Sequence, residues 1–441
     1  MTRQQARTPN IKRSAAIFVS ALLAVGSLSA CGDDTGGATN ETGGPDNEAV
    51  TLEVATTWTA ERADALTEIL KGFTEETGIK VELVTPGDQY ETVMKTRMGS
   101  GDLPDLWETH GWAVARYSEY LSPLNDQAWV DRLDPAIEPI VTGKDGNVYA
   151  LPLTMGINTI SYSKDAFDSA GVKAEEIRTW NDFEAACDKL LEAGITPIFI
   201  GNKTGDSAQL GEALPPTYLT NEGAPDNQAA ALKDGTFSFA EHWKPISEQV
   251  LRWLKAGYFN VDILTADNEA GTKAMGAGKA AFMFGGSNNI KFALTFSPDA
   301  NLGLLPAPSA ADGAPSSLSM GEGSAYGVWK DTEHPDEARK LLDYLAQADV
   351  VSQIATAAGD LPGFADVPQG DDKVTEYFRT AQTQFEGDLQ YIPLFDREYL
   401  PSGMWDDLTN SFTQILTDGT QEGVDDSIAT LDAGYQEKYT G

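Results

Sequence analysis

Residues 51–84 read TLEVATTWTAERADALTEILKGFTEETGIKVELV, and the order of apolar residues in this stretch determines the fold class. Its first residues alternate between apolar and polar, which predicts a strand that ends near Trp58. Apolar residues at helical spacing follow, and Gly78 stands where a helix is expected to be capped. Alternation then resumes over residues 79–83. A strand, a helix and a second strand in this order predict two parallel strands joined by a right-handed crossover.

The same succession of strand and helix signals continues along the chain. Further strands are predicted at residues 105–107, 195–200, 280–284, 302–305 and 325–329. The last two are separated by a stretch rich in Pro, Ala and Ser, which we expect to form a loop. From Pro335 onward helical stripes dominate. The fold class is therefore predicted to be α/β, with two lobes and a helical tail.

Two cysteines are present, Cys31 and Cys187. Thr179 stands three residues before Asp182, a spacing typical of a capping box at the start of a helix. The helix that follows places Cys187 on an apolar stripe. We therefore expect Cys187 to be a buried, unreactive core residue. The other members of the predicted stripe are Phe183, Ala186, Leu190 and Leu191.

The N-terminal 30 residues have the layout of a secretory leader. Basic residues between Arg3 and Arg13 precede an apolar segment at 15–25 that is too short to span a bilayer. The segment Leu28-Ser29-Ala30-Cys31-Gly32 resembles the lipobox of bacterial lipoproteins, which implies cleavage before Cys31 and lipidation of its thiol. An ordinary signal peptide with an incidental cysteine is the alternative. Residues 31–49 are polar and contain several glycines, which predicts a flexible tether.

Acidic residues outnumber basic ones, with 67 Asp and Glu against 31 Lys and Arg and a formal net charge of −36. Such a charge repels a phosphate backbone, so we expect no nucleic-acid partner. The length of 441 residues exceeds what one compact core supports, and it favours more than one domain.

The residues alone leave two hydrolytic functions open. The block Gly205-Asp206-Ser207 resembles the nucleophile block of GDS-type serine hydrolases, and residues 331–334 (DTEH) resemble their D-x-x-H block. However, the GDS block normally follows the first strand, and here it stands far along the chain. A glycosidase would need two opposed carboxylates, which the sequence cannot select from 67 acids. The three histidines are scattered and metal and phosphate motifs are missing from the sequence, so we expect no metal and no cofactor.

Several segments carry a more specific resemblance. They are, in order, the lipobox, the first strand with its terminal Trp, GSGDLPDLWE, YALPLTMGINTISYSKDAF, GITPIFIGNK, GKAAFMFGGSNN, PDEARKLLDYLA and LPGF. Together they resemble the extracellular solute-binding proteins, family 1, of bacterial ABC transporters, which are related to maltose-binding protein. The resemblance covers residues 50–441. It implies a two-lobed periplasmic-binding-protein fold of type II, with the ligand cleft between the lobes.

The resemblance also implies where the chain passes between the lobes. Crossings are expected near residues 155–159, 303–307 and 346–350. One lobe would then hold residues 50–155 plus 306–347, and the other would hold residues 156–305 plus 348–441.

The residues that line the cleft are implied in the same way. A sugar has apolar C–H faces that lie on aromatic rings, and hydroxyls that need carboxylates and amides. Ser287 and Asn288 stand where many family members carry a Trp, which puts one stacking contact in doubt. Core packing is the alternative role for the tryptophans, and solvent exposure is the alternative for the acids. The predicted ligand-binding residues are Trp58, Glu61, Glu108, His110, Trp112, Asn158, Asp206, Ser287, Asn288, Glu322, Trp405 and Asp406.

The prediction that results is a monomeric, lipid-anchored receptor on the extracytoplasmic face of the cell membrane, and not an enzyme. By resemblance, its ligand is a carbohydrate, expected to be an oligosaccharide, and its partners are the permease subunits of an ABC importer. A secreted hydrolase of the GDS or glycosidase type is the alternative function. A binding protein that feeds a signalling partner is a second alternative, and it is also not an enzyme.

Overall fold

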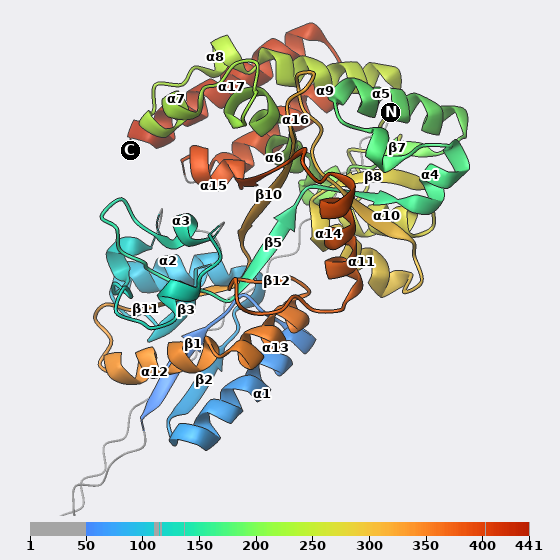
Figure 1. The fold of residues 1–441 in the computed structure, drawn as a ribbon. Helices are drawn as coiled ribbons and strands as arrows, with labels where there is room; N and C mark the ends of the chain where they lie inside the picture. Colours follow the sequence, from blue (N-terminus) through green and yellow to red (C-terminus); the bar gives the residue numbers. More distant parts are fainter. Residues whose placement is uncertain (1–49, 110–113, 115–116, 136, 402, 441) are drawn as a thin grey trace, which may run out of the picture. The chain divides into compact units, whose positions relative to one another are not determined.

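The computed structural model describes residues 50–440 except 110–113, 115–116, 136 and 402. The predicted leader, lipidated cysteine and tether, residues 1–49, lie outside the described residues. Residues 49–441 form one compact unit, whose helices and strands are drawn in Figure 1. Three sheets organise this unit within its described residues.

The first sheet contains the strand, helix and strand read from residues 51–84. In spatial order its strands are β2 (Lys80–Val84), β1 (Thr51–Ala55), β3 (Leu106–Glu108), β11 (Ala325–Val328) and β4 (Leu151–Pro152). β1 pairs in parallel with β2, and α1 (Ala60–Thr77) connects them, as predicted. Gly78 ends α1 with a φ of 78°, and its N–H donates to the Thr74 carbonyl. Because this left-handed conformation is strained for other residues, the glycine sets where α1 ends.

The third sheet organises the second part of the chain. In spatial order its strands are β7 (Thr196–Ile198), β8 (Ala280–Phe284), β6 (Ile160–Ser163) and β9 (Leu302–Leu305). β7 pairs with β8 in parallel, and β6 is antiparallel to both β8 and β9. All five residues of β8 are buried, as expected for an apolar strand covered on both faces.

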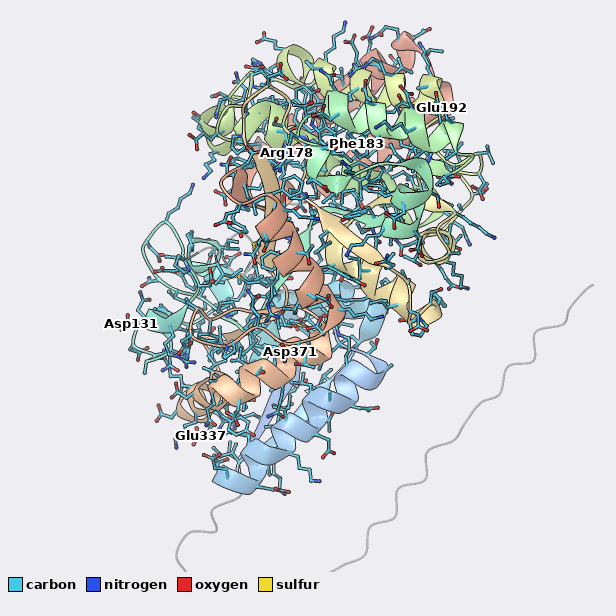
Figure 2. All side chains as sticks on the ribbon, turned by 45° about the vertical axis from the view of Figure 1, so that its right-hand side comes forward. Asp131, Arg178, Phe183, Glu192, Glu337 and Asp371 are labelled. Carbon is cyan, nitrogen blue, oxygen red and sulfur yellow. The ribbon has the colours of Figure 1, made fainter. Side chains whose placement is uncertain are left out.

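The helix α5 (Trp180–Glu192) packs on β7 and begins with the predicted capping box. Thr179 Oγ1 accepts from the Asp182 N–H, and Asp182 Oδ2 accepts from the Thr179 N–H at 2.9 Å. Cys187 is fully buried, as predicted, and this burial raises the pKa of its thiol. Leu191 is 39% exposed and lies off the buried stripe, which corrects one of the predicted members. Phe183 of this helix, labelled in Figure 2, packs on Phe282 of β8. The two ring centroids are 4.4 Å apart.

The middle sheet connects the other two. In spatial order its strands are β12 (Leu361–Pro362), β5 (Thr154–Asn158), β10 (Ser316–Glu322) and β13 (Leu389–Pro393). β4, β5 and β6 follow one another in the chain and belong to three different sheets, and so do β9, β10 and β11. The chain therefore passes through this sheet at β5 and again at β10, which pair antiparallel with Asn158 opposite Ser319.

These passages test two predictions. The predicted crossing at 155–159 coincides with β5. The predicted crossing at 303–307 is wrong, because β9 lies within the third sheet and residues 316–322 cross instead. Those residues were expected to be part of a loop. They form the fully buried strand β10 because β5 and β13 pair with its two edges.

From Pro335 onward the chain is mainly helical, as predicted. Within this part, α13 packs against α1 and β5. Residues 348–358 therefore lie beside elements of the predicted first lobe, and the lobe boundaries stay a prediction. The helices of this part are α12 (Pro335–Leu345), α13 (Ala348–Ala358), α14 (Lys373–Gln384), α15 (Phe395–Tyr399), α16 (Met404–Asp418) and α17 (Gln421–Thr440). The other helices are α2 (Tyr90–Ser100), α3 (Glu138–Val141), α4 (Lys164–Ala170), α6 (Leu210–Pro215), α7 (Ala229–Asp234), α8 (Phe239–His242), α9 (Lys244–Ala256), α10 (Asn268–Gly276) and α11 (Gly286–Phe296).

Acidic side chains populate the surface of this unit. Asp131, Glu192 and Asp371 are examples, and all three are exposed (Figure 2). In the part of the chain that the structure describes, every helix is too short or too polar to cross a bilayer.

Candidate functional site

A cavity of about 410 Å³ lies where the ends of strands from all three sheets meet, and we call it the inner cavity. Its volume falls within the range of about 300–1,000 Å³ that is typical of small-ligand sites. Six of the predicted ligand-binding residues line it together. They are Trp58, Glu108, Asn158, Ser287, Asn288 and Glu322.

Glu108 is the most connected of these residues. It ends β3, is 1% exposed, and accepts four hydrogen bonds from three residues. Its Oε2 accepts from the Thr56 hydroxyl at 2.8 Å and from the Thr57 N–H and hydroxyl at 2.6 and 2.7 Å. Its Oε1 accepts from the Ser324 hydroxyl at 2.6 Å. Since a carboxylate offers about four acceptor positions, Glu108 mainly holds the loops after β1 and β10 in place.

Two tyrosines enclose this carboxylate. The Tyr90 hydroxyl donates to the Glu108 carbonyl at 2.5 Å, and the Tyr326 hydroxyl donates to Thr56 Oγ1 at 3.0 Å. Burial raises the pKa of both phenols, and the nearby Glu108 carboxylate adds to the shift. Both hydroxyls therefore stay protonated and act as fixed donors.

Trp58 lies in the same network but presents little of its ring. Its Nε1–H donates to Ser324 Oγ at 2.8 Å, and the side chain is only 3% exposed. The guanidinium of Arg62 lies over the ring, with Cζ 4.6 Å from the centroid. An approaching ligand meets Arg62 before it meets the Trp58 ring.

The turn between β8 and α11 forms another wall of the inner cavity. Gly285 and Gly286 both have positive φ, and both N–H groups donate to the Thr159 carbonyl. A Cβ at Gly286 would overlap the Ile157 carbonyl, so only glycine allows this close approach to β5. The Ser287 hydroxyl donates to the Ile157 carbonyl at 3.2 Å. The two glycines thus bring the start of α11 against the crossing strand.

Six further residues with polar side chains line the inner cavity, and the sequence did not single them out. The side chain of Asn158 donates through Nδ2–H to Gln209 Oε1 at 3.0 Å. Asp360 forms an ion pair of 2.6 Å with Lys291, a residue that does not itself line the cavity. Gln209 follows the predicted loop around Asp206, and Asp360 precedes the segment LPGF, so both lie close to sequence signals that were recognised. The six are Thr57, Arg62, Gln209, Ser324, Asp360 and Arg397.

Arg397 reaches the inner cavity from α15, a helix of five residues. Its Nη1–H donates to the Glu322 carbonyl at 3.3 Å. The buried Glu212 of α6 holds this helix, because its carboxylate accepts from the Phe395 N–H at 2.8 Å and from the Asp396 N–H at 3.0 Å. Burial raises the pKa of Glu212 well above its usual value, and the neighbouring Asp396 raises it further.

The remaining predicted site residues divide into two groups. Asp206, Trp405 and Asp406 are described but lie outside the inner cavity, and whether they bind ligand stays a prediction. Asp206 is half-buried, accepts from Asn268 Nδ2–H at 2.9 Å, and has a pKa raised by burial. The half-buried Trp405 packs against the hydrophobic core that includes the buried residues of α16, and Asp406 is exposed. The second group comprises His110, Trp112 and the side chain of Glu61, which lie outside the described residues.

The residues of the suspected hydrolase motif have separate structural partners. The Ser207 hydroxyl is buried and donates to the Thr409 carbonyl in α16 at 3.3 Å. His334 precedes α12, which packs on β11 of the first sheet. Among the described residues, clusters of three or more His, Cys, Asp or Glu that could bind a metal are also absent.

Comparisons with known proteins agree with this architecture. Residues 58–351 match the family described as bacterial extracellular solute-binding protein. The melibiose/raffinose/stachyose-binding protein of Bacillus subtilis (strain 168) is 29% identical over 388 residues, which is 87% of this chain and 89% of that protein.

Solved structures show the same relationship. A putative binding protein from Bacillus subtilis, solved in an open conformation, has a TM-score of 0.80 and 28% identity, covering 90% of this chain and 99% of that one. A sugar transporter from Bacillus licheniformis in complex with stachyose has a TM-score of 0.74 and 29% identity, covering 88% and 100%. These similarities confirm the predicted two-lobed α/β fold.

Proposed function

Because the chain belongs to the bacterial extracellular solute-binding protein family, we propose that it captures an oligosaccharide in the inner cavity and delivers it to an ABC importer. The main support for this proposal is that four predicted site residues line the same cavity. They are Trp58, Glu108, Asn158 and Glu322. The cavity combines carboxylates, amides and two arginines, which suit sugar hydroxyls, while the Trp58 ring lies behind Arg62.

The relatives support a carbohydrate over other solutes. One is named for binding melibiose, raffinose and stachyose, and another was solved with stachyose. The proposed chemistry is binding followed by closure of the lobes about the crossing strands, without turnover. The lobe boundaries stay a prediction, residues 50–155 plus 306–347 and residues 156–305 plus 348–441, although the chain crosses at β10 and α13 packs on α1 of the first lobe.

The remaining parts of the proposal concern location and partners. Lipidated Cys31 would hold a monomeric receptor at the extracytoplasmic face of the membrane, beside the permease subunits. Tethering would raise the local concentration of loaded receptor at the permease. Neither a metal nor a cofactor is needed for this function.

A binding panel tests the proposal directly. The Cys31→Ser full-length protein should bind at least one of melibiose, raffinose and stachyose in isothermal titration calorimetry, with an arabino-oligosaccharide as comparison. Each sugar should be recovered unchanged after incubation, as measured by chromatography. Cleavage of a sugar would contradict the proposal, and so would failure of every sugar to bind.

The anchor is tested separately in cells. The Cys31→Ser variant should move from the membrane fraction to the soluble fraction, and it should bind sugar with unchanged affinity. A variant with a conservative change in the tether, Asn40→Ser, should remain in the membrane fraction. Retention of Cys31→Ser in the membrane would refute the anchor while leaving the binding function intact.

A further inference from the structure

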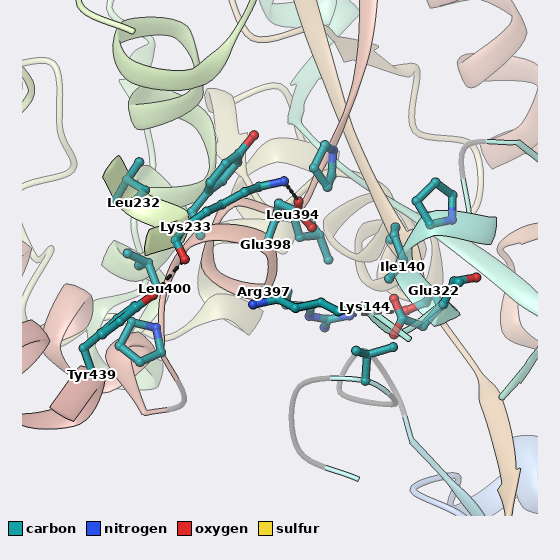
Figure 3. A pocket seen from close by; sticks show the side chains of 17 residues that line it. Ile140, Lys144, Leu232, Lys233, Glu322, Leu394, Arg397, Glu398, Leu400 and Tyr439 are labelled. Atoms are coloured by element: carbon teal, nitrogen blue, oxygen red, sulfur yellow. Dashed lines mark hydrogen bonds and ion pairs between the residues drawn. The ribbon is translucent and has the colours of Figure 1, made fainter. Parts of the chain in front are cut away.

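A second cavity adjoins the inner one, and we call it the outer cavity. It has a volume of about 490 Å³ and is drawn in Figure 3. The two cavities share Gly321, Glu322, Leu394 and Arg397 in their linings. A ligand that fills the inner cavity can therefore extend past Arg397 into the outer one.

The outer cavity differs from the inner one in chemistry. Its lining includes prolines, leucines and two tyrosines, Tyr399 of α15 and Tyr439 of α17. Figure 3 shows Tyr439 and Lys233 on one side, with Ile140 and Lys144 on the other. Aromatic rings and apolar side chains suit the C–H faces of sugar rings, whereas the inner cavity offers mainly groups that bind hydroxyls.

Both tyrosines are held in position without a ligand. The Tyr439 hydroxyl donates to the Lys233 carbonyl at 2.7 Å. Its ring lies against Gly235, where φ is 78° and where a Cβ would overlap the ring. The Tyr399 ring packs on Phe395 with centroids 5.4 Å apart, and Lys233 Nζ lies 5.4 Å from its centroid. Lys233 of α7 also forms an ion pair with Glu398 of α15, which stabilises the position of the two helices. Preorganised side chains of this kind lose little entropy on binding.

We propose that the outer cavity is a second subsite, in which Tyr399 and Tyr439 contact the sugar units that extend beyond the inner cavity. This inference rests on the proposed sugar binding, and it assigns the ligand class as an oligosaccharide of three or more hexose units. Each cavity alone has the volume of a small-ligand site, and the two adjoin, so a monosaccharide leaves the outer one unfilled.

The test compares one sugar series on matched variants. Galactose, melibiose, raffinose and stachyose are titrated into the Cys31→Ser protein and into the same protein with Tyr439→Ala or Tyr399→Ala. We expect the affinity for stachyose relative to melibiose to fall about two- to tenfold in each variant, as for the loss of one aromatic contact. Tyr439→Phe keeps the ring and should retain the ratio within about twofold.

Tyr391→Ala is the matched control, because this tyrosine is 45% exposed on β13 and lies outside both cavities. Thermal unfolding without sugar shows whether each variant is folded. If melibiose and stachyose bind but both alanine variants keep the wild-type ratio, the outer subsite is wrong and the proposed function stands. If no sugar in the series binds the parent protein, sugar binding and the outer subsite fall together.

Discussion

Glu108 illustrates how a residue that lines the inner cavity can serve mainly to position its neighbours. Its four hydrogen bonds connect the end of β3 to Thr56, Thr57 and Ser324. Ser324 in turn accepts from the indole of Trp58. The cavity wall therefore depends on one buried carboxylate that has little capacity left for a sugar hydroxyl.

Glu108→Gln should lower the free energy of unfolding by about 1–3 kcal/mol, because the amide turns a donor toward groups that are already donors. Urea denaturation at neutral pH measures the change. Glu68→Gln is the control, since the Glu68 side chain is 73% exposed, and a change within about 0.5 kcal/mol is expected. Equal stability of the two variants would show that the network does not stabilise the fold.

Arg62 covers the ring of Trp58, a predicted ligand-binding residue. Since its guanidinium covers a ring that is already 3% exposed, we expect Arg62 to donate to sugar hydroxyls itself. Arg62→Ala should therefore weaken sugar binding about tenfold in calorimetry. Arg252→Ala, which changes an exposed arginine paired with Glu184 outside both cavities, should leave the affinity unchanged. Tighter binding by Arg62→Ala would instead indicate that the sugar stacks on the uncovered ring.

At the scale of elements, the short helix α15 supplies Arg397 to the inner cavity and Tyr399 to the outer one. Five residues are too few for a stable isolated helix, so its position depends on tertiary contacts. Glu212 provides two of these contacts through the Phe395 and Asp396 N–H groups. The geometry of both cavities thus depends on an acid that is buried elsewhere, in α6.

This arrangement predicts a pH dependence of stability. The folded pKa of Glu212 is raised, so above about pH 4.5 the folded protein keeps a proton that the unfolded chain has lost. The free energy of unfolding should consequently fall as pH rises, by at most about 1.4 kcal/mol per pH unit, until the folded pKa is passed. Glu212→Gln carries no titrating group and should remove this fall.

Urea denaturation at pH 5, 6, 7 and 8 compares Glu212→Gln with the parent protein. Glu241→Gln serves as control, because the Glu241 side chain is 77% exposed. Parallel pH profiles for Glu212→Gln and the parent would refute the assignment of the raised pKa.

The sequence predicted elements best where local pattern and tertiary pairing agree. Gly78 and the box at Thr179 and Asp182 are local signals, and both are confirmed. β10 was missed because SSLSMGE lacks β-branched residues, and its strand conformation comes from pairing with β5 and β13. Arg397 was missed for a similar reason, since Glu212 and Phe395 meet across 183 positions. Five of the six predicted residues on the inner cavity came from family resemblance alone, because spacing does not bring them together. Glu108 was also indicated by its place just past a predicted strand, where open α/β sheets bind ligands.

At the scale of the whole molecule, the excess of acids should affect stability. With a formal charge of −36, the acidic side chains repel one another. This repulsion is stronger in the compact folded state than in the unfolded chain, and dissolved salt screens it. The midpoint of thermal unfolding at pH 7 should therefore rise between 0.01 and 0.5 M sodium chloride, in differential scanning calorimetry. At pH 4.2, near the isoelectric point, the same increase in salt should have a much smaller effect. A fall of the midpoint with salt at pH 7 would contradict this expectation.

The long separation between β3 and β11 has a consequence for synthesis. Glu108 and Ser324 are hydrogen-bonded but stand 216 positions apart. At a translation rate of about 5–20 residues per second, a ribosome needs roughly 10–45 s to make the intervening chain. During that time β3 has an open edge that can pair with another nascent chain. The first sheet therefore cannot be completed from an N-terminal fragment that stops before Ser324.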